Sequence, residues 1–409
     1  MPAVAPEILV WARETAGFTV DEAARRLPIG DARGSTARER LSAMEAGKAE
    51  ISRAMLVKMA TLYHRPLLTF YLAAPPRTGD RGEDFRTLPD RHTDAEPLID
   101  ALIRDVRARQ SMVRSLLDDE DAQPLPFVGG MSVAAGPDAV VADIQHRIGF
   151  DADSFRAEPK VEAAFNALRA KVEAVGVFVL LIGSLGSHHT AIDADAFRGL
   201  ALADPVAPFI VINDQDAKSA WSFTLLHELA HLWIGAGGVS GPHADGRVEQ
   251  FCNDVASRFL LPAPDLATVA IDRQMNLADI ASRVESFADE RRISRSLVIY
   301  RLFRDNRLSE ADWRALSDRF RAEWRQRRAT QRDENRQANG GPNYYTVRQH
   351  RIGTALLRLV ERTLGEGSLT PTKAGKVLGV KPRNVVPLLR YVATPTTTRS
   401  TSSRSSGHF

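Results

Sequence analysis

The chain lacks the features that would mark it as secreted or membrane-bound. A single cysteine, Cys252, stands among its 409 residues, which excludes internal disulfide bonds. The longest apolar runs, such as Val177–Ile182, fall far short of the roughly 20 residues that a membrane-spanning helix needs. The first residues lack a basic region followed by an apolar core, so we expect no secretion signal. Together these absences predict a cytoplasmic protein with no membrane partner.

An excess of charge of one sign is also missing. The 54 lysine and arginine residues nearly balance 51 aspartate and glutamate residues, leaving a net charge of +3. Nucleic-acid binding would therefore depend on a local basic surface rather than on the whole chain. The hydrophobic share of 44% is ordinary for a soluble globular protein, and the length predicts roughly two to four domains.

The first 76 residues have the pattern of a compact helical unit. Thr19 is placed to cap one helix, with Glu22 three residues later completing a capping box. Gly47 can end another helix, and Ser52 can cap the next. The predicted helices are Pro6–Ala16, Val20–Leu27, Ala37–Ala46 and Arg53–Tyr63.

The middle of the chain mixes strand-length and helix-length patterns. Val177–Gly183 and Pro208–Asn213 are short apolar runs typical of buried strands. Ser222–Gly235 and Arg247–Leu261 have helical spacing. We therefore predict a mainly α-helical protein with an α+β core of a small sheet and two site helices, flanked by helical N- and C-terminal domains.

Breaks in composition divide the chain into seven predicted segments. They are 1–76, a helix-turn-helix domain; 77–138, a helical linker; 139–265, the α+β domain; 266–325, a helical subdomain; 326–344, a polar linker; 345–392, a helical domain with a helix-turn-helix-like pattern; and 393–409, a disordered tail.

The run Thr224–Leu232 contains the spacing His-Glu-x-x-His, at His227, Glu228 and His231. Residues four apart on a helix share one face and lie about 6 Å apart along the axis, so both histidines can bind one metal ion. Glu228 lies about 100 degrees around the helix, where it can contact a water rather than the metal. This spacing marks zinc hydrolases, so we predict Zn²⁺ as the cofactor.

A catalytic zinc site needs a third protein ligand. His243, Asp245 and Glu249 are the candidates, and Glu249 is favoured because it begins a second helix. Asn253 lies one turn further on, where it can hydrogen-bond a ligand histidine. Cys252 shares that helix face but is favoured as a packing residue.

These residues predict hydrolysis of a peptide bond by water. Zinc lowers the pKa of water and polarises the scissile carbonyl, while Glu228 takes a proton and delivers it to the leaving amine. Candidates for a second oxyanion donor are His243, Tyr300 and Arg301. Phe209–Asn213 could pair with an extended peptide, or it could be an ordinary core strand.

Over roughly residues 140–320 the chain resembles the ImmA/IrrE metallopeptidases, bacterial gluzincin-like proteins of phages, mobile elements and stress responses. The resemblance rests on Phe197-Arg198-Gly199, Ala207–Asn213, Phe223–His231 and Glu249-x-x-Cys-Asn253-x-x-Ala256-x-x-Phe259-Leu-Leu-Pro262. It implies zinc held by His227, His231 and Glu249, with Glu228 as catalytic base. It also implies a transcriptional repressor as the substrate.

The N-terminal unit resembles the XRE-type helix-turn-helix regulators that are often fused to this family. Leu41-x-x-x-Glu45-x-Gly47 and the helix Leu56–Tyr63 with Arg65-Pro66-Leu67 carry the similarity. The resemblance implies a recognition helix at Ala37–Ala46 and DNA contacts from four basic residues. These are Arg38, Arg40, Lys48 and Arg53. The stretch Pro28–Thr36 is longer than the usual turn, so a protein-docking role remains an alternative.

The leading prediction is a zinc endopeptidase that cleaves one protein partner, a repressor or an antitoxin-type protein, in a regulatory, mobile-element or toxin–antitoxin setting. The alternative is a DNA-binding transcriptional regulator whose zinc site senses metal or is structural. A third possibility is a zinc hydrolase for a non-peptide amide. Glu228 discriminates between them, because a structural site needs no base.

Overall fold

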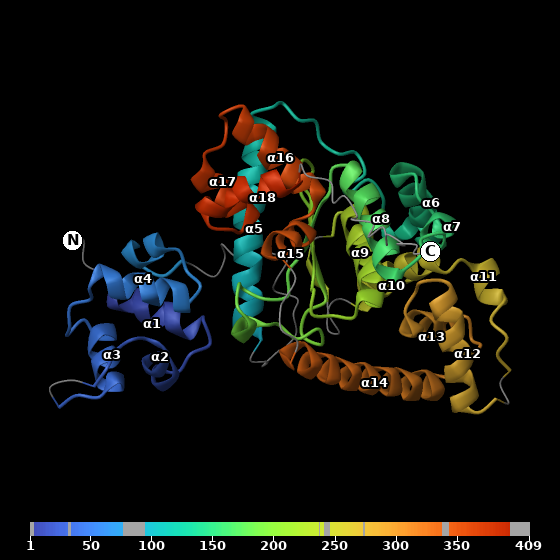
Figure 1. The fold of residues 1–409 in the computed structure, drawn as a ribbon, viewed down its shortest axis with the longest axis horizontal. Helices are drawn as coiled ribbons and strands as arrows, with labels where there is room; N and C mark the ends of the chain where they lie inside the picture. Colours follow the sequence, from blue (N-terminus) through green and yellow to red (C-terminus); the bar gives the residue numbers. More distant parts are fainter. Residues whose placement is uncertain are drawn as a thin grey trace, which may run out of the picture.

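The structure is a computed structural model that describes residues 4–31, 34–76, 95–236, 238–240, 246–272, 275–337 and 343–392. The protein is mostly helical around one small four-stranded sheet, so the predicted fold class is confirmed (Figure 1). Within the described residues, no helix is long and apolar enough to cross a membrane.

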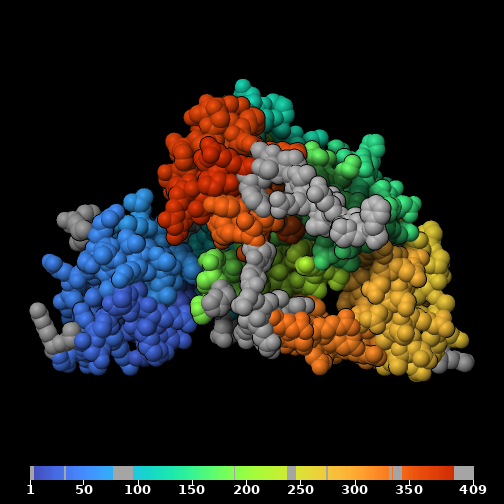
Figure 2. Space-filling view, in the orientation of Figure 1, coloured from blue at the N-terminus to red at the C-terminus, as the bar shows by residue number. Residues whose placement is uncertain are grey.

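The N-terminal unit has its own hydrophobic core, which includes Ile8, Leu41 and Phe70. Its helices are α1 (Pro6–Glu14), α2 (Val20–Arg26), α3 (Ala37–Glu45) and α4 (Arg53–Leu62), followed by the 3₁₀ helix η1 (Leu67–Tyr71). The predicted capping box at the start of α2 is confirmed, because the Thr19 side chain accepts from the backbone of residue 22 and the carboxylate of Glu22 accepts in return. In Figures 1 and 2 this unit forms a lobe at one end of the molecule.

The sheet contains β1 (Phe178–Leu181), β2 (Gly199–Leu202), β3 (Phe209–Ile212) and β4 (Gly238–Ser240), in the order β1-β3-β2-β4. β3 is parallel to β1 and antiparallel to β2, and β2 is antiparallel to β4. The strands β2 and β4 were not predicted, since each begins with glycine and has fewer β-branched and aromatic residues than β1 and β3. Alternate residues of β1, β2 and β3 face two different hydrophobic cores, so the sheet is buried on both faces.

One face of the sheet packs against the helices that surround the candidate site. The helices that contribute to this core are α6 (Pro137–Ile148), α7 (Ala152–Arg156), α8 (Val161–Ala174), α9 (Lys218–Trp233), α10 (Gly246–Leu260), α11 (Ala263–Ala267), α12 (Leu277–Glu290), α13 (Arg295–Arg304) and α14 (Glu310–Gln337). The short 3₁₀ helices η4 (Val133–Ala135) and η5 (His188–Thr190) lie in the connections. Trp233, near the end of α9, stacks on Phe127 with ring centroids 4.3 Å apart.

The opposite face of the sheet is covered by helices from distant parts of the chain. They are α5 (Glu96–Asp118), α15 (Tyr344–Ile352), α16 (Thr354–Gly365), α17 (Pro371–Leu378) and α18 (Val385–Val392), with the 3₁₀ helix η6 (Pro382–Asn384) before α18. The predicted linker 77–138 and the predicted domain 345–392 therefore do not stand apart, because their helices share one core with the sheet. The continuous apolar run of β1 is typical of a strand that is buried on both faces.

The polar segment after residue 325 also differs from the prediction. The structure continues α14 (Glu310–Gln337) well into the predicted linker 326–344. This segment is rich in arginine and glutamine, which favour helix even where no apolar face requires it. The predicted tail 393–409 lies outside the described residues.

A buried carboxylate attaches the C-terminal helices to the core. Glu173 Oε2 accepts hydrogen bonds from the backbone N–H groups of Thr354 and Ala355 at 2.9 and 3.1 Å, and from the Thr354 hydroxyl at 2.6 Å. Its other oxygen accepts from Arg169 Nε at 3.1 Å, and both charged side chains are buried. One side chain therefore caps α16 and neutralises a buried arginine.

Substitution Glu173→Ala is expected to lower the free energy of unfolding by about 3 kcal/mol, because it leaves the Arg169 charge buried without compensation. Urea unfolding of the full chain measures this. The control is Glu162→Ala, whose exposed ion pair with Lys218 should contribute at most about 1 kcal/mol. Equal losses for the two variants would contradict the role of Glu173.

Candidate metal centre

The helix α9 lies at the centre of the protein and is buried on almost every side. It packs against α8, α10, β2 and β3, and nearly all of its residues from Trp221 to Trp233 are buried. His227 and His231 lie one turn apart on this helix, and each is 5% exposed. The core packing of α9 therefore fixes the backbone from which both imidazoles project.

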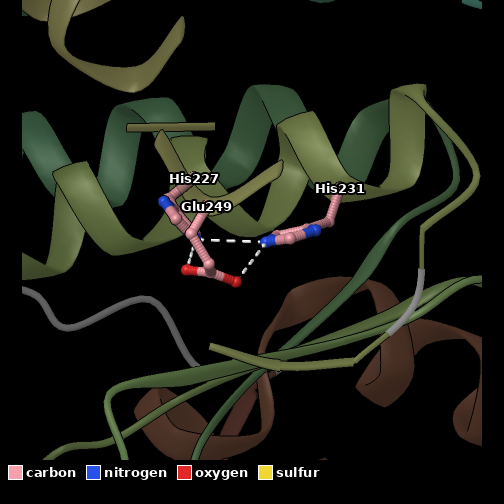
Figure 3. Close-up of side chains that lie close together, drawn as sticks. All are labelled: His227, His231 and Glu249. Atoms are coloured by element: carbon pink, nitrogen blue, oxygen red, sulfur yellow. Dashed lines mark hydrogen bonds and ion pairs between the residues drawn. The ribbon is translucent and has the colours of Figure 1, made fainter. Parts of the chain in front are cut away.

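The helix α10 brings a carboxylate to the two histidines. Its apolar residues Cys252, Val255 and Phe259 are fully buried, which orients the helix against α9. Glu249 lies in its first turn. Figure 3 shows the Glu249 carboxylate lying across from both histidine rings, which project from one helix toward it.

The three donor groups are close enough to share one ion. The Nε2 atoms of His227 and His231 are 3.2 Å apart. Glu249 Oε2 is 3.2 Å from His227 Nε2, and Oε1 is 3.3 Å from His231 Nε2. Donors about 2.05 Å from a tetrahedral metal ion are separated by about 3.3 Å. The three residues therefore fit a bound metal ion.

The charges of this cluster also suit a cation. Burial opposes ionisation of Glu249, but hydrogen bonds from His227 and His231 outweigh it and lower the pKa of this carboxyl to about 2. Burial is the largest influence on His227 and lowers the pKa of its imidazole, while Glu249 and Asn253, as hydrogen-bond acceptors, raise it. At neutral pH the cluster thus presents a carboxylate and an uncharged His227 ring, the forms that bind metals.

Asn253 and Cys252 follow Glu249 on the same helix. Asn253 lies close enough to His227 to raise the pKa of its imidazole, while the predicted hydrogen bond to the free ring nitrogen of a ligand histidine stays a prediction. Cys252 is fully buried in the core, and burial raises the pKa of its thiol, with the nearby carboxylates of Glu249 and Glu228 adding to the effect. A thiol held neutral in this way packs rather than binds metal.

Glu228 is fully buried beside the metal-binding face of α9 and lies against the sheet. A Cβ atom added at Gly199 of β2 would lie 2.3 Å from Glu228 Oε1 and 2.8 Å from Thr224 Cγ2. Gly199 shares its sheet face with Ala201, which lies in the core around α9. The missing side chain at position 199 therefore makes the space that the Glu228 carboxylate occupies.

The sequence alone did not reveal the role of Gly199 beside Glu228. Phe197-Arg198-Gly199 contributed to the family resemblance, but a contact between β2 and α9 joins residues almost thirty positions apart. The only signal was a glycine at the start of a short apolar run, which often marks a close approach.

Other candidates for the site lie elsewhere. His243 and Asp245 are outside the described residues. Tyr300 donates its hydroxyl to Asp254 at 2.9 Å, and Arg301 lines a separate pocket with Asp254. The structure does not bring Tyr300 or Arg301 into the cluster of His227, His231 and Glu249.

The prediction that β3 pairs with a peptide is wrong. Both edges of β3 are occupied, by β1 on one side and β2 on the other. Phe209 and Ile212 are fully buried within this pairing. The segment is an ordinary core strand, which was the alternative interpretation.

The predicted DNA-binding side chains lie on and after α3. Arg38 is exposed but forms an ion pair with Asp21 at 3.3 Å, and Arg40 donates to the backbone carbonyl of Gly30. Lys48 and Arg53 are exposed. Internal partners already engage the two arginines of the predicted recognition helix, and DNA binding stays a prediction.

Comparison with known proteins gives one match. Residues 182–303 match the family model described as the IrrE N-terminal-like domain, a metallopeptidase family. This range contains His227, Glu228, His231 and Glu249. No curated protein and no solved structure matches the chain. The chain thus carries a metallopeptidase domain of the ImmA/IrrE type in its middle, while no family match supports the N-terminal helix-turn-helix unit.

Loss of any one donor group is expected to abolish stoichiometric zinc binding. His227→Ala, His231→Ala and Glu249→Ala should each weaken zinc affinity by more than about 100-fold, since loss of a partner outside the ligand set already costs 10–100-fold. Metal content after dialysis, measured by atomic emission, checks this. His146→Ala, at an exposed histidine on α6, should keep the wild-type metal content. Unchanged zinc in the three donor variants would show that the ion binds elsewhere.

Proposed function

We propose that this protein is a zinc-dependent endopeptidase of gluzincin type that cleaves one specific protein partner. The observation that carries the proposal is the cluster of His227, His231 and Glu249 with Glu228 buried beside it, inside the segment that matches a metallopeptidase family. A structural zinc site would need the three donors, but it would not need a carboxylate that β2 makes room for.

In this proposal the three donor residues hold the ion and Glu228 moves the proton. When bound, zinc supplies a Lewis acid that polarises the scissile carbonyl and makes water easier to deprotonate. The Glu228 carboxylate accepts one proton from the attacking water and delivers it to the leaving amine as the carbon–nitrogen bond breaks. Asn253, through the predicted hydrogen bond to His227, orients that imidazole.

The outer edge of β4 is the proposed binding edge for an extended peptide. In the described part of the chain β4 pairs with a strand on one side, through β2. Ser240 of β4 lies opposite Gly199 of β2, the residue against which Glu228 packs. A peptide added to this edge would pair through its backbone and lie two strand spacings, about 10 Å, from β2 and Gly199.

The proposed substrate is a transcriptional repressor or an antitoxin-type protein in the bacterial cytoplasm, in a regulatory or mobile-element setting. The similarity of the central domain to ImmA/IrrE peptidases supports this choice. The N-terminal unit, which has a core of its own, is proposed to bind DNA or to present the partner. Lys48 and Arg53 are the exposed basic residues for contacts with phosphates.

Substitution Glu228→Gln is expected to lower the cleavage rate by about 100-fold or more, because the amide keeps the shape but cannot accept the proton. Cleavage is measured by immunoblot in cells that co-express a candidate repressor substrate, and zinc content is measured on the purified protein. Zinc content and any DNA binding should persist. The control is Glu162→Gln on the surface of α8. If the Glu228→Gln variant still relieved repression, the protein would be a metal-containing regulator instead.

Substitution Gly199→Ala tests the contact between the sheet and the catalytic carboxylate. The added methyl group must displace Glu228, so we expect cleavage to fall at least about tenfold while zinc content stays near that of the wild type. Gly246→Ala is the matched control, because nothing lies within 4 Å of the Cβ it would add. Equal activity of the two variants would rule out a positioning role for Gly199.

A further inference from the structure

A pocket of about 400 Å³ lies outside the metal centre, between α6, α10 and α13. Its volume falls in the range of small-molecule sites. Charged side chains from all three helices line it: Asp138 from α6, Asp254 and Arg258 from α10, and Arg301 and Arg304 from α13. None of these residues belongs to the cluster of His227, His231 and Glu249.

Arg301 is the unusual member of this lining. Its side chain is 8% exposed, and with the residues that the structure describes it makes neither a side-chain hydrogen bond nor an ion pair. The neighbouring Asp254 is already engaged, because Arg304 donates to both of its oxygens at 3.1 and 2.8 Å and Tyr300 donates at 2.9 Å. A buried guanidinium without an anionic partner is costly, and an anion in the pocket would remove that cost.

Arg258 lines the same pocket, and its ion pair within the protein is weak. It pairs with Asp138 at 2.5 Å, but the Asp138 side chain is 80% exposed, so water competes with this ion pair. The Nε atom of Arg258 is buried and has no hydrogen-bond partner in the described chain. Burial, and then the charge of Arg258, lower the pKa of Arg301. The two cations therefore influence each other, and both line the same pocket.

The net charge of the lining does not by itself select an anion. Asp305 adds a third carboxylate to those of Asp138 and Asp254, which balances the three arginines. The selection comes from the local arrangement, because Asp254 is engaged by Arg304, while among the described residues Arg301 has no hydrogen-bonded or ion-paired carboxylate and interacts with Asp254 and Asp305 only through longer-range charge. Apolar atoms of Val141, Pro262 and Ala263 complete the lining and suit the carbon skeleton of a small organic molecule.

We propose that this pocket binds a small organic anion through a phosphate or carboxylate group held by Arg301 and Arg258. The planar guanidinium groups suit two parallel hydrogen bonds to such an anion. The site is separate from the proposed peptidase chemistry, and its ligand is expected to bind whether or not zinc is present.

The test uses the full-length chain with inorganic phosphate and with acetate as probes, at constant ionic strength. Calorimetric titration should show saturable binding of at least one probe, and a preference for one of them identifies the anionic group. Arg301→Met should weaken that binding at least about tenfold. Arg314→Met, at an exposed arginine that pairs with Glu310 on α14, is the matched control and should bind as the wild type does.

Two further variants keep the result unambiguous. Arg301→Lys keeps the charge but loses the forked geometry, so it should fold and bind the probe more weakly than the wild type does. His227→Ala, which disrupts the zinc cluster, should bind phosphate normally, and loss of binding there would place the anion at the metal centre and overturn the proposal. The proposal is also overturned if neither phosphate nor acetate binds saturably, or if the Arg301→Lys or Arg301→Met variant binds the probe as tightly as the wild type does.

Discussion

The burial of α9 between the sheet and α10 is the constraint on which the rest of the molecule depends. A helix in this position should be apolar, yet it carries His227, Glu228 and His231 into the core. Burying these groups is tolerable only if each has compensation nearby. Glu249 from α10 faces both imidazoles, and β2 leaves room for Glu228 at Gly199. The polar site and the packing around it therefore form together.

Through the sheet, the packing around α9 also depends on the C-terminal third of the chain. Because its strands are buried on both faces, the core around α9 on one side requires a second core on the other. The helices α5 and α15–α18 supply that second core. Glu173 joins the two sides, since it lies on α8 and caps α16. The helices after residue 343 are thus part of the support of the site rather than an appended module.

The sequence predicted the features that depend on local spacing and missed those that depend on tertiary contact. The spacing of His227 and His231, and the start of a second helix near Glu249, were sufficient to predict a cluster that the structure brings together. Cap residues such as Thr19 placed helix starts correctly, because capping is a local hydrogen-bond pattern. The strands β2 and β4 begin with glycine and have few β-branched or aromatic residues, so neither has the strand-like composition of β1 and β3, and the contact of Gly199 with Glu228 has no local signature. The docking of α15–α18 on the sheet was missed because an apolar helix face does not specify what covers it.

The helix α10 connects the proposed metal centre to the proposed anion pocket. Glu249 and Asn253 are four residues apart and share the face toward α9, while Asp254 and Arg258 are four apart and share the face toward the pocket. The two pairs are offset by five residues, so their faces differ by about 140 degrees around the helix. Apolar residues of the same helix, such as Val255 and Phe259, are packed in the core and let it move only as a unit. The helix α10 therefore presents residues of both sites from two of its faces, and its packed core residues hold the two sites at a fixed separation.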